Sequence, residues 1–216
     1  MRSGNLKLHP MVLAALLLAT PIAAAEKITA HAAEDATAAA QYKASPVSTD
    51  PKAIAAGAYT LDPHHTSVTA KLAHMGLSRY TLRFDAVTGR FAFDPAQATA
   101  SGLAIAIDPN SIDTGDPAFD RKIASKYFQT DTYPSIVFEA GTVKVIGDRM
   151  LVHGTLNFHG VKKPVAMNVT YRGSSGARMG FSGEATFKRS EFGVGEWIPL
   201  EADEVTILVE TEFVKA

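Results

Sequence analysis

The sequence contains no cysteine among its 216 residues, and this absence excludes several classes of protein. No disulfide can form, and no thiolate is present to act as a nucleophile or a metal ligand. A lipoprotein anchor is also excluded, because such an anchor needs a cysteine to carry its acyl chains. The hydrophobic core alone must therefore stabilise the fold.

An excess of positive charge is also missing. The chain has 21 basic and 22 acidic residues, and without Arg2 and Lys7 there remain 19 basic residues against 22 acidic ones, a net charge of −3. The sequence has no basic stripe with interleaved aromatic residues. Nucleic acid is therefore not an expected partner.

No apolar run is long enough to form a stable membrane span. The stretch "MVLAALLLATPIA" is interrupted by Pro21 and is shorter than the ~20 residues that a spanning helix needs. Arg2 and Lys7 precede it, and three alanines, Ala23 to Ala25, stand at its end. This order predicts a secretory signal peptide over residues 1–25, and a retained membrane anchor is the alternative. After cleavage we expect no stable membrane insertion, and a periplasmic or extracellular location fits.

Residues 26–57 are rich in Ala, Thr, Ser and Pro and hold few large apolar side chains. Such a segment cannot bury enough surface to offset its ordering entropy, so we expect a flexible tether. A transient helix is the alternative, since alanine favours helices. Residues 58–216 then remain as one domain with a sizeable core.

This domain reads as β-strands, because apolar and polar residues alternate in eight segments. Short turns join most of them, which predicts antiparallel neighbours. Eight such strands predict a closed barrel or a sandwich, and an eight-stranded barrel is filled by side chains or holds one slender ligand. The segments are 65–73, 81–94, 101–107, 134–140, 149–158, 164–171, 178–187 and 204–213.

The connection 108–134 is too long for a hairpin loop and carries helical signals. Asp116 can cap a helix whose first residue is Pro117. Phe119, Ile123 and Tyr127 then recur at every fourth position and form one apolar stripe. We expect one short amphipathic helix that closes or borders the opening of the barrel.

Five stretches between Ala58 and Val214 together resemble the YceI-like family, the periplasmic polyisoprenoid-binding proteins. They are "LDPHHTSVTAKLAH", "NSIDTGD", "FQTDTYPSIVFE", "VHGTLNFHGVKKPV" and "RSEFGVGEWIPLEADEVTI". The resemblance implies an all-β, eight-stranded antiparallel lipocalin-like barrel with an elongated cavity for an isoprenoid or other long-chain lipid. It also implies export to the periplasm and no established catalytic activity. Two positions depart from the family: Ala70 stands where Phe is common, and Leu82 where Gly is common, so the shape of the cavity stays open.

We expect the cavity to be lined by one set of inward apolar side chains, although the same set would also fill a solid core. The alternation weighs the two equally, and the resemblance favours the cavity. The expected lining residues are Leu72, Phe84, Ile105, Phe138, Phe158, Met167, Phe181 and Ile207.

At the cavity mouth we expect His65, His74, Phe119, Ile123 and Trp197, the last of which is alternatively a packing anchor. Three basic residues could meet an anionic head group at the rim, although ordinary solvation explains them equally well. They are Lys71, Arg79 and Arg83.

A metal, a cofactor and catalysis are not expected. His153 and His159 lie about 20 Å apart along one strand, too far to share an ion. The sequence contains no G-x-S-x-G nucleophile elbow, and its glycines do not form a phosphate-binding loop. The expected function is to bind and sequester or carry a long-chain apolar molecule. The alternatives are an envelope stress or interaction module with a filled barrel, and an enzyme acting on a lipid. A homodimer is a possible partner state, and it could form through exposed strand edges, although a closed barrel has none to offer.

Overall fold

The structure is a computed structural model, and it describes residues 32–37, 39–40 and 46–216. The chain divides into two compact units, residues 1–46 and 47–216. In the first unit residues 32–37 and 39–40 are helical. The expected signal peptide, residues 1–25, lies outside the described residues. Among the helices that the structure describes, none is both long and apolar enough to span a bilayer.

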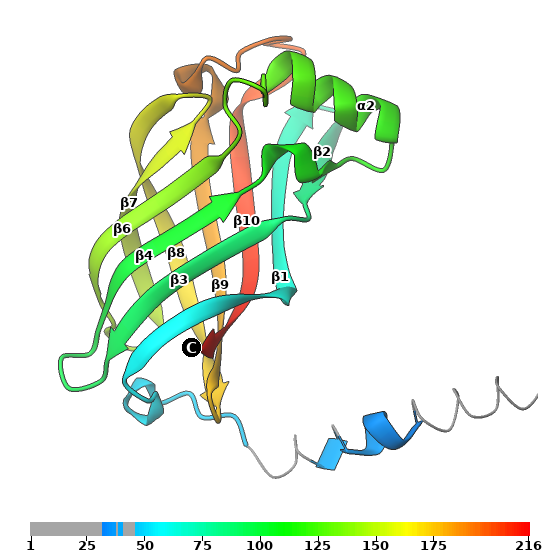
Figure 1. Cartoon of the computed structure of the whole chain (residues 1–216). Helices are drawn as coiled ribbons and strands as arrows, with labels where there is room; N and C mark the ends of the chain where they lie inside the picture. The colour runs from blue at the N-terminus through cyan, green and yellow to red at the C-terminus, as the bar shows by residue number, and fades with distance from the viewer. Residues whose placement is uncertain (1–31, 38, 41–45) are drawn as a thin grey trace, which may run out of the picture. The chain divides into compact units, whose positions relative to one another are not determined.

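The second unit is an antiparallel sheet rolled into a barrel (Figure 1). Its ten strands are β1 (Gly57–His74), β2 (Ser78–Phe84), β3 (Val87–Asp94), β4 (Thr99–Ile107), β5 (Ile112–Asp113), β6 (Ile136–Lys144), β7 (Arg149–Phe158), β8 (Val161–Ser175), β9 (Arg178–Lys188) and β10 (Glu201–Lys215).

Ten strands make eight wall strands, because β2 continues into β3 and β4 continues into β5. Both β2 and β3 pair with β1, Phe84 with Val68 and Phe91 with Tyr59, so the two form one bent strand. Strands β4 and β5 pair with that bent strand in the same way. Pairing of β1 with β10 along most of their length closes the ring. The predicted eight-stranded antiparallel barrel is confirmed.

At one end of the barrel, the lower end in Figure 1 where the C-terminus lies, aromatic rings pack against one another. The ring of Phe91 stacks on Tyr59 at 5.5 Å and meets Phe213 edge-on at 4.8 Å between centroids. Phe181 packs against both phenylalanines. Tyr59 is only 1% exposed, so this end of the interior is closed.

The stretch before β1 also packs on the lower end, although the sequence predicts a flexible tether up to residue 57. Ser48 and Ser174 exchange two backbone hydrogen bonds of 2.8 Å, and a short 3-10 helix, η1 (Pro51–Ala53), follows. Ile54 is 5% exposed and reaches the floor of the barrel interior. Burial of this side chain offsets part of the ordering cost that composition alone suggests.

The opposite, upper end carries the predicted helix (Figure 1). Helix α2 (Pro117–Lys122) starts as expected, with the Asp116 carboxylate accepting from two backbone amides and proline in the first turn. It then widens into a π-helical turn, η3 (Ile123–Tyr127), in which the amide of Phe128 donates to the carbonyl of Ile123 at 2.9 Å. The remaining elements are two 3-10 helices, η2 (Pro109–Ser111) and η4 (Arg189–Phe192).

The π-turn changes which side chains of this connection face the barrel. One extra residue in the turn brings Phe128 onto the same side as the predicted stripe. The ring of Phe128 lies 6.3 Å from Phe84 and 5.3 Å from Phe158, between centroids. A strict α-helical period does not predict this contact, because the widened turn depends on what the segment packs against.

Candidate ligand-binding cavity

The barrel interior is hollow. It encloses a cavity of about 610 Å³ that reaches from the aromatic lower end to the helix-bearing upper end. Small-molecule sites commonly have volumes of about 300–1,000 Å³ and mostly apolar walls. The volume and the lining of this cavity therefore both suit an apolar ligand.

All eight residues that the sequence places inward lie on the cavity wall. Each comes from a different wall strand, so together they encircle the space. In chain order they are Leu72, Phe84, Ile105, Phe138, Phe158, Met167, Phe181 and Ile207.

The middle of the barrel is hollow because several inward side chains there are small. Ala70 pairs with Ile207, which pairs with Ala185, so two alanines stand in one row around the wall. In the next row Gly183 pairs with Val209 and carries no side chain at all. These small residues cannot reach the barrel axis, and the space stays unfilled.

The two positions that depart from the family pattern face each other across the β1–β2 pairing. Ala70 and Leu82 are cross-strand partners, and both are buried and line the cavity. The smaller side chain at Ala70 enlarges the interior there. Leu82 faces inward and takes back part of that space.

The cavity mouth contains four of the five residues expected there. His74, Phe119, Ile123 and Trp197 line the upper part of the cavity. The indole N–H of Trp197 donates to the hydroxyl of Tyr127 at 3.0 Å, which ties the loop before β10 to η3. Because Trp197 is 59% exposed and also lines the cavity, it lies on the lip of the opening.

A polar pair lies beside this lip. Nε2 of His74 is 3.8 Å from Oε1 of Glu201, where the first residues of β10 meet the end of β1. The other carboxylate oxygen, Oε2 of Glu201, is buried and has no hydrogen-bond partner. An unpaired buried acceptor is costly, so this oxygen is a ready site for a donor on a ligand.

Arg189 holds the loop that carries Trp197. Its guanidinium donates to four backbone carbonyls at 2.8–3.0 Å, those of Val194, Glu196, Glu201 and Ala202. Sequence reasoning missed this residue. The available signal was an arginine directly before the glycine-bearing loop of "RSEFGVGEW", where free carbonyls need donors.

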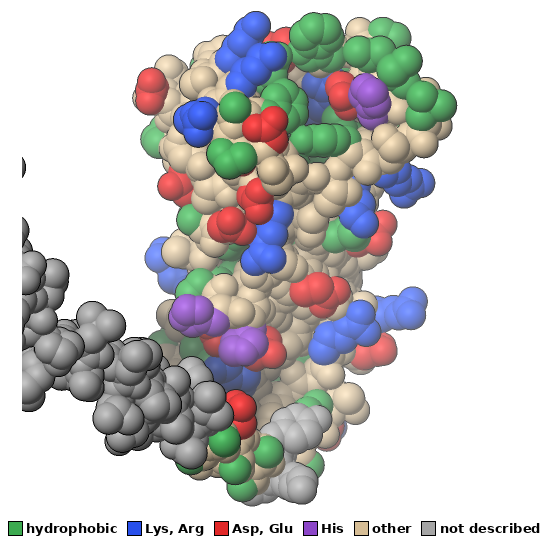
Figure 2. Space-filling model, turned by 90° about the vertical axis from the view of Figure 1, so that its right-hand side faces the viewer, with side chains coloured by type: hydrophobic (Ala, Val, Ile, Leu, Met, Phe, Trp, Pro, Cys, Tyr) green, Lys and Arg blue, Asp and Glu red, His purple; other side chains and the backbone are tan. Residues whose placement is uncertain are grey.

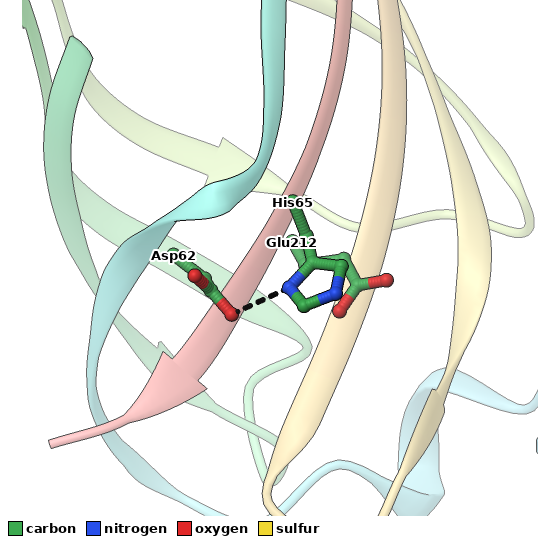
Figure 3. Close-up of side chains that lie close together, drawn as sticks. All are labelled: Asp62, His65 and Glu212. Atoms are coloured by element: carbon green, nitrogen blue, oxygen red, sulfur yellow. Dashed lines mark hydrogen bonds and ion pairs between the residues drawn. The ribbon is translucent and has the colours of Figure 1, made fainter. Parts of the chain in front are cut away.

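His65 does not lie at the mouth, which corrects the expectation from the sequence. Between the pairs Asp62–Glu212 and Thr66–Thr211, strand β1 has three residues and β10 has none, so a β-bulge turns His65 out of the barrel. Its side chain is 57% exposed and hydrogen-bonds through Nδ1 to Asp62 at 2.9 Å (Figure 3).

This outer cluster is an ion-pair network. Ligand-type atoms of Asp62, His65 and Glu212 lie within 4.8 Å of one another. Arg178, however, donates to the carboxylates of both Asp62 and Glu212, so a cation already neutralises them. The hydrogen bond from Arg178, helped by one from His65, holds the pKa of Asp62 far below its usual range. The network joins β1, β9 and β10 and is a poor site for a metal.

The remaining histidines of "VHGTLNFHG" do not converge. His153 is exposed on β7. His159 adopts a positive φ of 51° in the following turn, where its ring lies 4.4 Å from that of Tyr133 and its Nδ1 lies 3.2 Å from the carbonyl oxygen of Phe192. Each histidine thus has its own surroundings.

Comparisons with known proteins agree with this architecture. A family model described as the YceI-like domain matches residues 59–213. A UPF0312 protein of Shewanella baltica is 32% identical in an alignment of 153 positions that covers 67% of this chain and 80% of that protein.

Two solved structures have similar folds. BcnA of Burkholderia cenocepacia matches with a TM-score of 0.64 and 30% identity, over 70% of this chain and 98% of that one. A polyisoprenoid binding domain from Saccharophagus degradans matches with a TM-score of 0.59 and 19% identity, over 73% and 98% of the two chains. The barrel, the order of its motifs and the matching family model together make this chain a member of the YceI-like family.

Proposed function

We propose that this protein binds a long-chain apolar molecule, a polyisoprenoid or a similar lipid, and sequesters or carries it in the periplasm. The observation that carries the proposal is the cavity of about 610 Å³ with inward apolar side chains from every wall strand. Membership of the YceI-like family supports it, and the predicted signal peptide supports the location.

Burial of the chain supplies the affinity. Each buried CH₂ contributes about 0.8 kcal/mol, so about ten of them contribute ~8 kcal/mol, which corresponds to a micromolar dissociation constant before ordering costs. Because an apolar tube measures length and girth, we expect several chains of similar size to bind.

The polar groups support one orientation of the ligand. Deep in the barrel, the hydroxyls of Thr66 and Thr211 lie 2.8 Å apart and bond to each other, so they need no ligand. At the mouth, Lys122 and the His74–Glu201 pair line the opening. The apolar chain therefore points inward and a polar head group lies at the mouth, where the free oxygen of Glu201 can accept a hydrogen bond.

Binding explains this site better than catalysis does. The hydroxyl of Thr66 hydrogen-bonds to the carbonyl of Asp62 and to the hydroxyl of Thr211, and neither partner is a base that would activate a nucleophile. His74→Gln should leave the amount of bound ligand unchanged, because burial of the apolar chain supplies the affinity. Turnover of a lipid that is lost in His74→Gln would favour the enzymatic alternative instead.

Native mass spectrometry of the chain purified after export tests the proposal. We expect a retained apolar mass that organic extraction removes and that an added polyisoprenoid alcohol restores. An apo mass that persists after incubation with the alcohol would favour the interaction module. Cell fractionation, with N-terminal sequencing of the mature chain, tests the location: we expect a periplasmic protein that starts near Glu26.

A further inference from the structure

The opening of the cavity is bordered by exposed apolar side chains. Among the described residues eight large hydrophobic side chains are exposed, and five of them lie in the two loops beside the mouth. Leu77, at 83%, is the most exposed of all. In Figure 2 hydrophobic side chains gather around a hollow at the top of the molecule. We call these five residues the apolar rim: Met75, Leu77, Trp197, Ile198 and Leu200.

The rim is one continuous surface. Its two loops, 75–77 between β1 and β2 and 193–200 before β10, are joined by a hydrogen bond of 2.8 Å from the amide of Met75 to the carbonyl of Leu200. Trp197 and Leu200 also line the cavity, whereas Met75, Leu77 and Ile198 do not. A ligand inside the barrel therefore cannot account for the exposure of the last three.

Basic side chains flank the rim. Arg121, Lys122 and Lys126 are exposed on α2 and η3, and the ammonium groups of the two lysines lie 6.0 Å and 5.5 Å from the ring centroids of Phe119 and Tyr127. Arg79, at the start of β2, is exposed beside the other loop.

Three acids of this end are occupied by hydrogen bonds. Asp116 caps α2, Asp120 accepts from the amide and hydroxyl of Thr114, and Asp203 accepts from Ser190. Glu201 faces His74. Glu196 is the one acidic residue within the loop 193–200. Apolar loops with basic neighbours match the acyl boundary and anionic head groups of a phospholipid surface.

We propose that the mouth end docks on an anionic phospholipid bilayer, with the apolar rim at the interface, so that a chain passes between bilayer and cavity without crossing water. The inference rests on the proposed function and adds the surface with which the carrier exchanges its ligand. Tryptophan and leucine favour the interfacial region, and docking needs no membrane span. A second copy is a poorer occupant, because two mouths face to face would oppose their basic residues.

Vesicle sedimentation of the mature full-length chain tests docking. We expect binding to phosphatidylcholine vesicles that contain phosphatidylglycerol, and about tenfold weaker binding by Leu77→Glu. The matched control is Ile146→Glu, since Ile146 is 76% exposed in the turn at the opposite end of the barrel. Equal binding by Leu77→Glu and the parent would overturn the proposal.

The role of charge is tested with Arg121→Gln/Lys126→Gln, since neither side chain lines the cavity. We expect this variant to bind vesicles with and without phosphatidylglycerol to a similar, weak extent and to lose most of its salt dependence. A parent that ignores phosphatidylglycerol would contradict an anionic surface.

Trp197 is the single tryptophan of the chain and reports on the rim directly. Docking should shift its emission to shorter wavelength and make it accessible to quenchers in the acyl region. Leu77→Glu should need about tenfold more lipid to reach this shift, whereas Ile146→Glu should need the same amount as the parent. An unchanged emission in vesicle-bound parent protein would show that another face docks.

Two further measurements separate docking from ligand binding. A long-chain alcohol delivered from cyclodextrin should bind Leu77→Glu as it binds the parent, whereas Ala70→Phe should bind the alcohol about tenfold more weakly and still bind vesicles. If the parent binds the alcohol and no vesicles, docking alone is refuted; if it binds no alcohol, the proposed function fails independently. A dimer that Leu77→Glu dissociates would assign the rim to a second copy and refute the bilayer.

Discussion

The two ends of this barrel share one backbone pattern and differ in the size of their inward side chains. At the lower end Tyr59, Phe91 and Phe213 pack ring against ring, and the two phenylalanines form the floor of the cavity. Halfway up, Ala70 and Gly183 face the same axis and leave it empty. Both regions alternate apolar and polar residues in the same way, so alternation alone does not distinguish a packed interior from a hollow one.

The two ends of the barrel therefore have different roles. The aromatic end, with Ile54 beneath it and the Arg178 network outside, stabilises the fold. At the upper end, apolar surface in the cavity and on the rim is not covered by other side chains, and this surface is available to a ligand or a bilayer. Apolar residues thus stabilise the fold at the lower end, where they pack against one another, and provide a binding surface at the upper end, where they do not.

The largest expected effect compares one substitution at the two levels. Phe91→Ala should reduce the free energy of unfolding by about 3–5 kcal/mol, because it opens a hole in a packed cluster. Phe138→Ala should cost clearly less, since that ring is only partly buried, whereas Phe91 is 7% exposed and packs against three aromatic rings. Denaturant unfolding of both variants measures the difference, and equal losses would mean that the two levels are packed alike.

A smaller effect should follow from removing the guanidinium that holds the mouth loop. Arg189→Met leaves four carbonyls without their donor and should cost about 1–3 kcal/mol. Hydrogen exchange should quicken in residues 193–201 while the lower barrel stays protected. Lys188→Met is the control, because Lys188 directly precedes Arg189 and its own side chain is exposed. Unchanged exchange in the loop would show that other contacts hold it.

Filling the cavity should affect binding more than stability. Ala70→Phe adds a ring into empty space, so we expect about tenfold weaker binding of a long-chain alcohol and a stability change within ~1 kcal/mol. Ala140→Phe is the contrasting variant, since Ala140 is buried in the core and does not line the cavity. It should lose more stability. If thermal unfolding shows that Ala70→Phe loses more stability than Ala140→Phe, the empty space does not lie beside Ala70.

The smallest effect should come from the outer network and should depend on pH. Asp62 has a depressed pKa in the folded protein, so its pairing with Arg178 stabilises the fold fully above the unfolded pKa of about 4 and loses that effect as pH falls below it. Arg178→Gln should thus be less stable than the parent at pH 7, with a gap that narrows below pH ~4. Arg83→Gln, which breaks an exposed pair with Asp85, is the control. If the stability difference between Arg178→Gln and the parent stays constant down to low pH, ionisation of Asp62 does not cause it.

Much of this architecture could be predicted because each prediction needs only neighbouring residues. Alternation identified the eight wall strands and the inward positions, and Asp116 with Pro117 predicted the start of the helix. The position of His65 could not be predicted in this way, because a bulge depends on pairing with β10, which is about 145 residues away in the chain. The role of Arg189 was missed for the same reason: its acceptors are carbonyls whose arrangement only the folded loop creates.

The sequence by itself determined the eight strands, the direction of most of their side chains and the resemblance to a family whose fold is a barrel, since these follow from local periodicity and ordered motifs. Only the tertiary structure decided that the interior is hollow, that Phe128 joins its wall and that the exposed apolar residues form a rim at its mouth. The physical reason is that a cavity and a patch are properties of volumes and surfaces shared by strands far apart in the chain, and no single segment carries them.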